Sequence, residues 1–253
     1  MNKVYISLLA VFLVTASLSE HALSQDSMTV ANAVVAAADR SPEDRALDAG
    51  RKPVELLAFL GIQPGWRIAD LGAGGGYTTE LLKRAVGSEG VVYGQNSKKM
   101  LEMFLEKPWS ARLAKPVMMG VVRLDRDFDD PFPDGLRPLD AVTMVLFYHD
   151  TVWLGVNREA MNKAVFAALK PGGLFVIVDH SARSEDGAKV TDTFHRIAED
   201  VVKSEVLAAG FVLDAQADFL RNKDDTRDWN DSPRAAGERR GTSDRFVLRF
   251  RKP

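Results

Sequence analysis

The chain has 253 residues, of which 46% are hydrophobic, so it can bury the core of one large domain or of two small ones. Its 33 Lys and Arg residues against 35 Asp and Glu residues leave a formal net charge of -2, without the basic excess that nucleic-acid-binding proteins usually show. Because the chain contains no cysteine, disulfides, thiolate metal sites and cysteine nucleophiles are excluded. The charge balance therefore predicts no nucleic-acid partner, and the partner that we expect is a small-molecule substrate.

The first 24 residues have the pattern of a secretory signal peptide. A basic start at Lys3 is followed by the apolar run Val4–Ala16, and Ala22 and Ser24 supply the small residues before a cleavage site. The run is shorter than the roughly 20 apolar residues that a membrane-spanning helix needs. We expect export, to the periplasm in a Gram-negative cell, with no stable membrane insertion after cleavage. An uncleaved anchor is the alternative.

Residues 25–60 are expected to form helices that cap the functional site, and residues 61–253 to form one α/β domain. The pair Ser41-Pro42 is typical of a helix start, with a hydroxyl at the N-cap and proline at the first helical position. The many charges of this helix favour a solvated face. The alternative is that Asp48 and Arg51, one turn apart, form a lid over a bound ligand.

A glycine-rich stretch follows the first predicted strand. The apolar run from Ile68 ends in Asp70, and four of the next six residues are glycines. Glycine permits positive φ and lets a ligand approach the backbone, and the pattern of residues 77–84 predicts a helix whose N-terminus would face that ligand. A dinucleotide fingerprint fails in both frames, because its third glycine would fall at Tyr77 or Thr79. The alternative is a turn that merely packs the helix tightly.

The spacing of Asp70, Gly72, Gly74 and Gly76 resembles the first motif of class I S-adenosylmethionine-dependent methyltransferases. The resemblance implies that the three glycines bring the backbone against the methionine part of S-adenosylmethionine, and that Asp70 orients it. It also implies a Rossmann-like α/β fold: a seven-stranded, mostly parallel sheet with an antiparallel C-terminal hairpin and helices on both faces.

The second predicted strand, Val91–Gly94, leads to a departure from the family pattern. Gln95 and Asn96 stand where an acidic residue usually takes the ribose hydroxyls. Since an amide can also hydrogen-bond a diol, Asn96 is the candidate ribose ligand, with an ordinary turn residue as the alternative.

A helix over residues 101–113, interrupted at Pro108, and a strand over residues 117–124 are predicted next. An acidic loop follows them. The resemblance implies that Asp127 holds the adenine amino group and that Phe128 packs against the adenine ring. A merely solvated loop is the alternative.

The rest of the chain continues the alternation of strands and helices. The remaining predicted elements are a strand over 140–146, a helix over 158–169, a Lys-Pro-Gly-Gly turn at 170–173, a strand over 174–180, a helix over 191–209, a strand from 211 toward 220 and a last strand over 245–250. The turn before the fifth strand is a second resemblance to class I methyltransferases, and the last two strands predict a hairpin.

Three histidines remain after the predicted signal peptide: His149, His180 and His195. Each is expected at the carboxyl edge of the sheet, where open α/β folds bind ligands. For methyl transfer, His149 is the candidate general base, with Asp150 or Tyr148 orienting the base or the acceptor. The alternative is an exported protein of this fold that has lost the cofactor and binds a ligand or a divalent metal through the three histidines.

Overall fold

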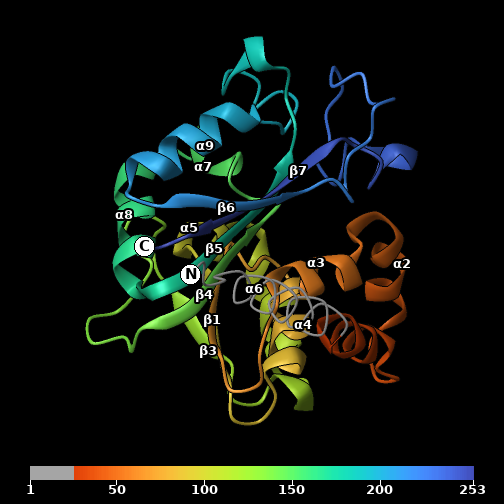
Figure 1. Ribbon diagram of the computed structural model, residues 1–253. Helices are drawn as coiled ribbons and strands as arrows, with labels where there is room; N and C mark the ends of the chain where they lie inside the picture. Colours follow the sequence, from red (N-terminus) through yellow and green to blue (C-terminus); the bar gives the residue numbers. More distant parts are fainter. Residues whose placement is uncertain (1–25) are drawn as a thin grey trace, which may run out of the picture.

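A computed structural model describes residues 26–253, which form a central sheet with helices on both faces (Figure 1). The predicted signal peptide, residues 1–24, lies outside the described residues. The strand order is β3-β2-β1-β4-β5-β7-β6, and β7 is antiparallel to both of its neighbours while the other pairs are parallel. This topology confirms the predicted Rossmann-like α/β fold with its antiparallel C-terminal hairpin.

The strands are β1 (Arg67–Leu71), β2 (Val91–Asn96), β3 (Val122–Asp125), β4 (Leu139–Val145), β5 (Leu169–His180), β6 (Val212–Ala217) and β7 (Arg245–Arg251). The labelled helices are α2 (Pro42–Arg51), α3 (Pro53–Leu60), α4 (Tyr77–Val86), α5 (Lys98–Met100), α6 (Glu106–Leu113), α7 (Asp150–Trp153), α8 (Arg158–Ala168) and α9 (Glu199–Ala208), and residues 26–36 are also helical. Within the part of the chain described here, no helix has the length and apolar character needed to cross a bilayer.

The core consists of two main apolar clusters, one on each face of the sheet. Phe175 and Val176 are neighbours in β5 but belong to different clusters, because successive strand side chains point to opposite faces. Val206 of α9 packs in the cluster that contains Phe175, and Leu82 of α4 packs in the cluster that contains Val176. Helices thus cover both faces, and the edge formed by the strand ends is left for the functional site.

The segment before β3 differs from its prediction. Pro108 does not interrupt the helix where it stands, since it lies inside α6; a π-helical turn, Leu101–Leu105, precedes it instead. Proline lacks the N–H and crowds the carbonyl four residues earlier, so the distortion falls in the preceding turn. The strand predicted over residues 117–124 is limited to β3, because residues 116–118 form a 3₁₀ turn.

The helix predicted over residues 191–209 is wrong in its first part. Helix α9 starts at Glu199, and the chain before it forms turns that are hydrogen-bonded to the end of β5. The Ile197 N–H donates to the His180 carbonyl, and the Ala182 N–H donates to the Ile197 carbonyl. These bonds hold His195 in a loop beside the carboxyl end of β5.

Candidate functional site

A cavity of about 720 Å³ lies at the carboxyl ends of the central strands. It runs from the glycine loop after β1 to the chain that follows β4 and β5, and α2 and the loop before β7 complete its wall. Its size is typical of a small-molecule site. The cavity lies at the edge where open α/β sheets bind their ligands.

The glycines of the loop serve different purposes. Gly72, Gly74 and Gly76 all have positive φ, at 67°, 57° and 81°. A Cβ on Gly72 would lie 2.5 Å from the Phe147 ring, and one on Gly76 would lie 2.7 Å from the Arg112 side chain. A Cβ on Gly74 would meet only a backbone oxygen at 4.0 Å. Gly72 and Gly76 therefore permit close packing, whereas Gly74 presents its backbone to open space in the cavity wall.

Asp70 ends β1 at the base of this loop. Its Oδ2 accepts a hydrogen bond from Thr79 (2.6 Å) and its Oδ1 accepts one from Thr143 (2.8 Å). Burial raises the pKa of Asp70 to about 6, although both hydroxyls and the charge of Arg51 act in the opposite direction. The carboxyl group thus lines the cavity in a position where a cation would stabilise its ionised form.

The amides after β2 hold the glycine loop in place. Asn96 Oδ1 accepts from the Gly74 N–H (2.9 Å) and its Nδ2 donates to the Gly74 carbonyl (3.2 Å), while Gln95 Oε1 accepts from the Gly72 N–H (3.1 Å). Asn96 is buried and does not line the cavity. The Asn96 amide is thus hydrogen-bonded to the loop backbone, and its contact with a ribose stays a prediction.

The predicted adenine residues also lie off the cavity wall. Asp127 is exposed and Phe128 is buried, and neither lines the cavity. Phe128 stacks on Phe147 with ring centroids 4.9 Å apart, and Phe147 in turn lies against Gly72. The contacts of Asp127 and Phe128 with an adenine stay predictions. What the structure shows is that Phe128 supports the Phe147 ring, which does line the cavity.

An apolar wall that the sequence did not identify also lines the cavity. Met100, Phe104 and Leu105 come from the helical segment after β2 and line the cavity together with Phe147. Phe104 is 48% exposed although it is a large apolar side chain. The π-helical turn, which only the structure reveals, brings this wall to the cavity.

Helix α2 covers the glycine loop. The Tyr77 hydroxyl donates to Asp48 (2.6 Å), Arg40 binds both oxygens of the same carboxylate, and the Arg51 guanidinium lies 4.6 Å from the centre of the Tyr77 ring. The expectation that these charges form a solvated face is therefore wrong for Asp48 and Arg51. Burial lowers the pKa of Arg51, and no carboxylate of the described chain lies within ion-pair distance of it.

Two arginines fasten α2 to the rest of the fold. Arg112 of α6 binds Asp44 of α2 and Glu80 of α4, and it donates to the Gly75 carbonyl at 3.0 Å. Burial alone would raise the pKa of both carboxyl groups, but Arg112 and the neighbouring cations hold these pKa values below their usual range. At the other end, Arg245 donates to the Gly50 carbonyl at 2.6 Å.

The chain after β4 places His149 and Asp150 in the cavity wall. Leu146 has a φ of 57°, which is rare outside glycine, and this kink turns the chain toward the cavity. His149 Nδ1 lies 2.7 Å from Asp179 Oδ1, and His149 Nε2 lies 3.1 Å from Asp150 Oδ1. Burial disfavours the imidazolium, but the two carboxylates outweigh it and raise the pKa of His149 to about 10. The two carboxylates therefore favour the protonated form of His149, and its role as general base stays a prediction.

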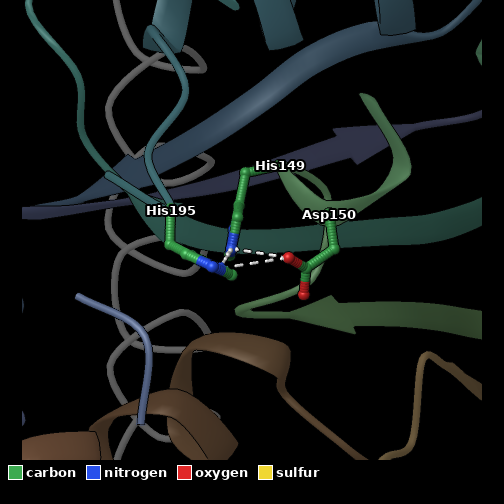
Figure 2. Close-up of side chains that lie close together, drawn as sticks. All are labelled: His149, Asp150 and His195. Atoms are coloured by element: carbon green, nitrogen blue, oxygen red, sulfur yellow. Dashed lines mark hydrogen bonds and ion pairs between the residues drawn. The ribbon is translucent and has the colours of Figure 1, made fainter. Parts of the chain in front are cut away.

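The other two histidines differ in their surroundings. His195 has a φ of 54°, and its Nδ1 lies 3.3 Å from both His149 Nε2 and Asp150 Oδ1 (Figure 2). His180 also lines the cavity, but its Nδ1 faces Ser243 (2.9 Å) and Asp231 (2.5 Å) in the loop before β7. The structure therefore gathers His149, Asp150 and His195, and leaves the Nδ1 of His180 directed to the C-terminal loop.

Tyr148 points away from the cavity. Its side chain is fully buried, and its hydroxyl donates to Glu205 (2.7 Å) and accepts from Asn162 (2.8 Å), between α8 and α9. The Tyr148 hydroxyl is thus bonded between two helices, and its predicted role beside the acceptor gains no support from this position. Tyr148 and His149 are adjacent in the chain, and the turn after β4 sends their side chains in different directions.

Comparison with known proteins agrees with this geometry. Residues 69–177, which run from β1 to β5, match a family model described as a methyltransferase domain. The chain is similar to an S-adenosylmethionine-dependent methyltransferase from Aquifex aeolicus, at 17% identity and a TM-score of 0.58, covering 84% of this chain and 94% of that one. Among curated proteins, none matches the sequence significantly.

Two further solved structures share the methyltransferase fold. A putative methyltransferase from Bacillus halodurans has 15% identity and a TM-score of 0.53, with 79% of this chain and 97% of that one covered. The glycopeptide N-methyltransferase MtfA, solved with sinefungin, has 17% identity and a TM-score of 0.52, with 86% of this chain and 88% of that one covered. At these identities the likeness concerns the fold.

The Aquifex aeolicus protein depends on S-adenosylmethionine, and the residues of the cavity in this chain have the chemistry to hold that cofactor. The open backbone at Gly74, the apolar wall and the carboxyl of Asp70 surround one space. Arg51 lines the same space and supplies a cation for a carboxylate. S-adenosylmethionine joins a nucleoside to an amino acid, so it needs an apolar surface for the nucleoside, a carboxylate for the ammonium group and a cation for the carboxylate.

Proposed function

We propose that this protein transfers a methyl group from S-adenosylmethionine to a small-molecule acceptor bound beside His149, Asp150 and His195. One observation carries the proposal: a single cavity connects the glycine loop to this polar cluster. A methyl transferase needs cofactor and acceptor in one enclosed space, because an in-line displacement depends on alignment and on exclusion of water.

We place the cofactor at the end of the cavity whose lining groups match the parts of S-adenosylmethionine. The adenosine part would lie against Met100, Phe104 and Phe147, and the methionine part against the Gly74 backbone, with Asp70 and Arg51 taking its ammonium and carboxylate. When bound, S-adenosylmethionine supplies an electrophilic methyl group on a positively charged sulfur.

The acceptor end is the wall after β4. Trp153 lines it, and the Trp153 indole donates to Asp150 Oδ1 (2.7 Å), which fixes that carboxylate at the edge of the cavity. Asp150 and His195 are the groups at this end that an acceptor hydroxyl, amine or thiol can contact. Their partners hold them in place, so they orient an acceptor without rearrangement.

The first test is calorimetric titration of the purified protein with S-adenosylhomocysteine. We expect saturable binding at one site per chain, and absence of binding at about millimolar ligand would overturn the proposal. The second test measures S-adenosylhomocysteine formed from S-adenosylmethionine with pools of phenols, amines, thiols and carboxylic acids. Asp150→Asn should keep cofactor binding and lose turnover of the acceptor that is found.

We also propose that residues 1–24 direct export and are then removed. The apolar run and the small residues before residue 25 support this proposal. The test is intact-mass measurement of protein expressed with its own N-terminus in a Gram-negative host. Periplasmic protein lacking the first 24 residues is the expected result, and full-length protein in the cytosol would contradict it.

A further inference from the structure

Three potential metal ligands converge on one point of the cavity wall. His149 Nε2 lies 3.1 Å from Asp150 Oδ1, and His195 Nδ1 lies 3.3 Å from each of these two atoms. Figure 2 shows the two rings and the carboxylate directed toward one another. Two of the ligands follow β4, and the third comes from the loop before α9. The tertiary fold therefore brings together a group that is separated by 46 residues in the sequence.

The spacing of these atoms matches the coordination sphere of zinc. Zinc binds imidazole nitrogen and carboxylate oxygen at about 2.0–2.1 Å, usually as a tetrahedron. The edge of such a tetrahedron is about 1.63 times the bond length, or about 3.3–3.4 Å. The three observed separations, 3.1, 3.3 and 3.3 Å, are those of one tetrahedral face.

The surroundings of His149 are those of a metal-bound imidazole. Asp179 Oδ1 lies 2.7 Å from His149 Nδ1, and Asp179 itself accepts from the backbone N–H groups of His149 (2.7 Å) and His180 (2.8 Å). Metal-binding histidines commonly give their second ring N–H to a carboxylate in this way, which fixes the tautomer and the ring orientation. Asp179 is fully buried, so its position is rigid.

A positive charge joins His149 to Asp150. An ionised carboxylate only accepts hydrogen bonds, so His149 Nδ1 carries a proton toward Asp179. His149 Nε2 lies 3.1 Å from Asp150 Oδ1, so without a metal ion the second ring proton joins these two atoms. A bound metal ion would take the place of that proton.

We propose that His149, Asp150 and His195 form a binding site for a divalent transition metal, with zinc as the preferred ion and Asp179 as the supporting carboxylate. The site differs from the three-histidine site that the sequence suggested as an alternative, because Asp150 replaces His180 as a ligand. The fourth coordination position faces the methyltransferase cavity, since all three ligands line it.

The metal would activate the acceptor, and this part rests on the proposed methyl transfer. An acceptor hydroxyl or thiol in the fourth position would have a lowered pKa and release its proton to solvent. Its lone pair would then form the new bond to the methyl carbon, while the carbon–sulfur bond breaks and its electron pair stays on sulfur. Methylated acceptor and S-adenosylhomocysteine are the products.

The test is metal binding by chelator-treated protein made without a histidine tag. Zinc titration should give one equivalent per chain, and Co²⁺ should give the intense visible absorption of a tetrahedral site. His195→Gln and Asp150→Asn should abolish stoichiometric binding, and Asp179→Asn should weaken it by about 10–100-fold. Circular dichroism and S-adenosylhomocysteine binding, measured on each variant, show that it is folded.

His180→Gln is the matched control, since His180 lines the same cavity without joining the cluster. It should keep one equivalent of metal. Absence of stoichiometric metal in the wild-type protein, or loss of metal from His180→Gln but not from His195→Gln, would overturn the site. Metal binding in a protein that binds no S-adenosylhomocysteine would leave the metal site standing and refute the proposed methyl transfer.

Discussion

Replacement of Gly74 by alanine separates the two reasons for which this loop contains glycine. Gly74 has a φ of 57°, so an alanine there adopts a left-handed conformation that costs about 1 kcal/mol. Its Cβ would meet no protein atom closer than a backbone oxygen at 4.0 Å, so no packing cost is added. The protein should fold with a free energy of unfolding lowered by about 1 kcal/mol.

The effect on the cofactor should be much larger than the effect on folding. The new methyl group would occupy the surface on which we place the methionine part of S-adenosylmethionine. We expect at least a tenfold loss of affinity for S-adenosylhomocysteine, which corresponds to about 1.4 kcal/mol. Urea denaturation gives the stability change, and calorimetry gives the affinity.

Gly61→Ala is the matched control. Gly61 ends α3 with a φ of 64° and has no atom within 4 Å of a built Cβ, so the backbone strain is the same. It does not line the cavity. We expect both variants to lose the same amount of stability, and only Gly74→Ala to lose affinity for S-adenosylhomocysteine. Wild-type affinity in Gly74→Ala, or an equal affinity loss in both variants, would refute the placement of the cofactor on this backbone.

Three other predictions concern charge. Arg112→Met should lower the free energy of unfolding by about 3 kcal/mol at neutral pH, because the buried Asp44 and Glu80 lose the guanidinium that binds both, and Lys115 remains as their common cation. The pKa values of both carboxyl groups are lowered in the folded protein, so the stability that these ion pairs add is present above about pH 5 and is lost as the pH falls through the folded pKa values. Urea denaturation at a series of pH values should therefore show a smaller acid-dependent loss of stability in Arg112→Met than in the wild-type protein. Affinity for S-adenosylmethionine should rise as the pH rises through about 6, because Asp70 becomes ionised there. Calorimetry of Asp70→Asn should show no such rise. An affinity of the wild-type protein that does not change with pH would contradict the contact between Asp70 and the ammonium group of the cofactor. Arg51→Met should weaken S-adenosylmethionine binding by about tenfold and leave methylthioadenosine, which lacks the amino-acid part, unaffected; equal losses for both ligands would count against a carboxylate contact.

Local patterns in the sequence were enough to predict the fold class. The glycine loop after β1 and the alternation of strand and helix depend on neighbours in the chain, and backbone conformation largely follows from such neighbours. The start of α2 is an example, since the Ser41 side chain accepts from the Asp44 N–H and Pro42 occupies the first helical position. The antiparallel hairpin was likewise predicted from two strand patterns with no helix between them.

Side-chain direction is the property that the sequence patterns did not predict. Tyr148 and His149 are adjacent, yet only His149 reaches the cavity, because the positive φ of Leu146 sets how the chain leaves β4. Asn96 has the residue type of a ribose ligand, but the structure uses its amide to hold Gly74. A residue type states which bonds a side chain can form, and packing selects its partner.

The sequence by itself determined that a strand, a glycine loop and a helix would present backbone to a ligand, and that histidines would follow the neighbouring strands. Only the tertiary structure decided that His195, carried by a strained loop, meets Asp150 while His180 faces Ser243. The physical reason is that glycine conformation is a local property of the backbone. A three-residue cluster depends on how separate segments pack, and no short stretch of sequence encodes that packing.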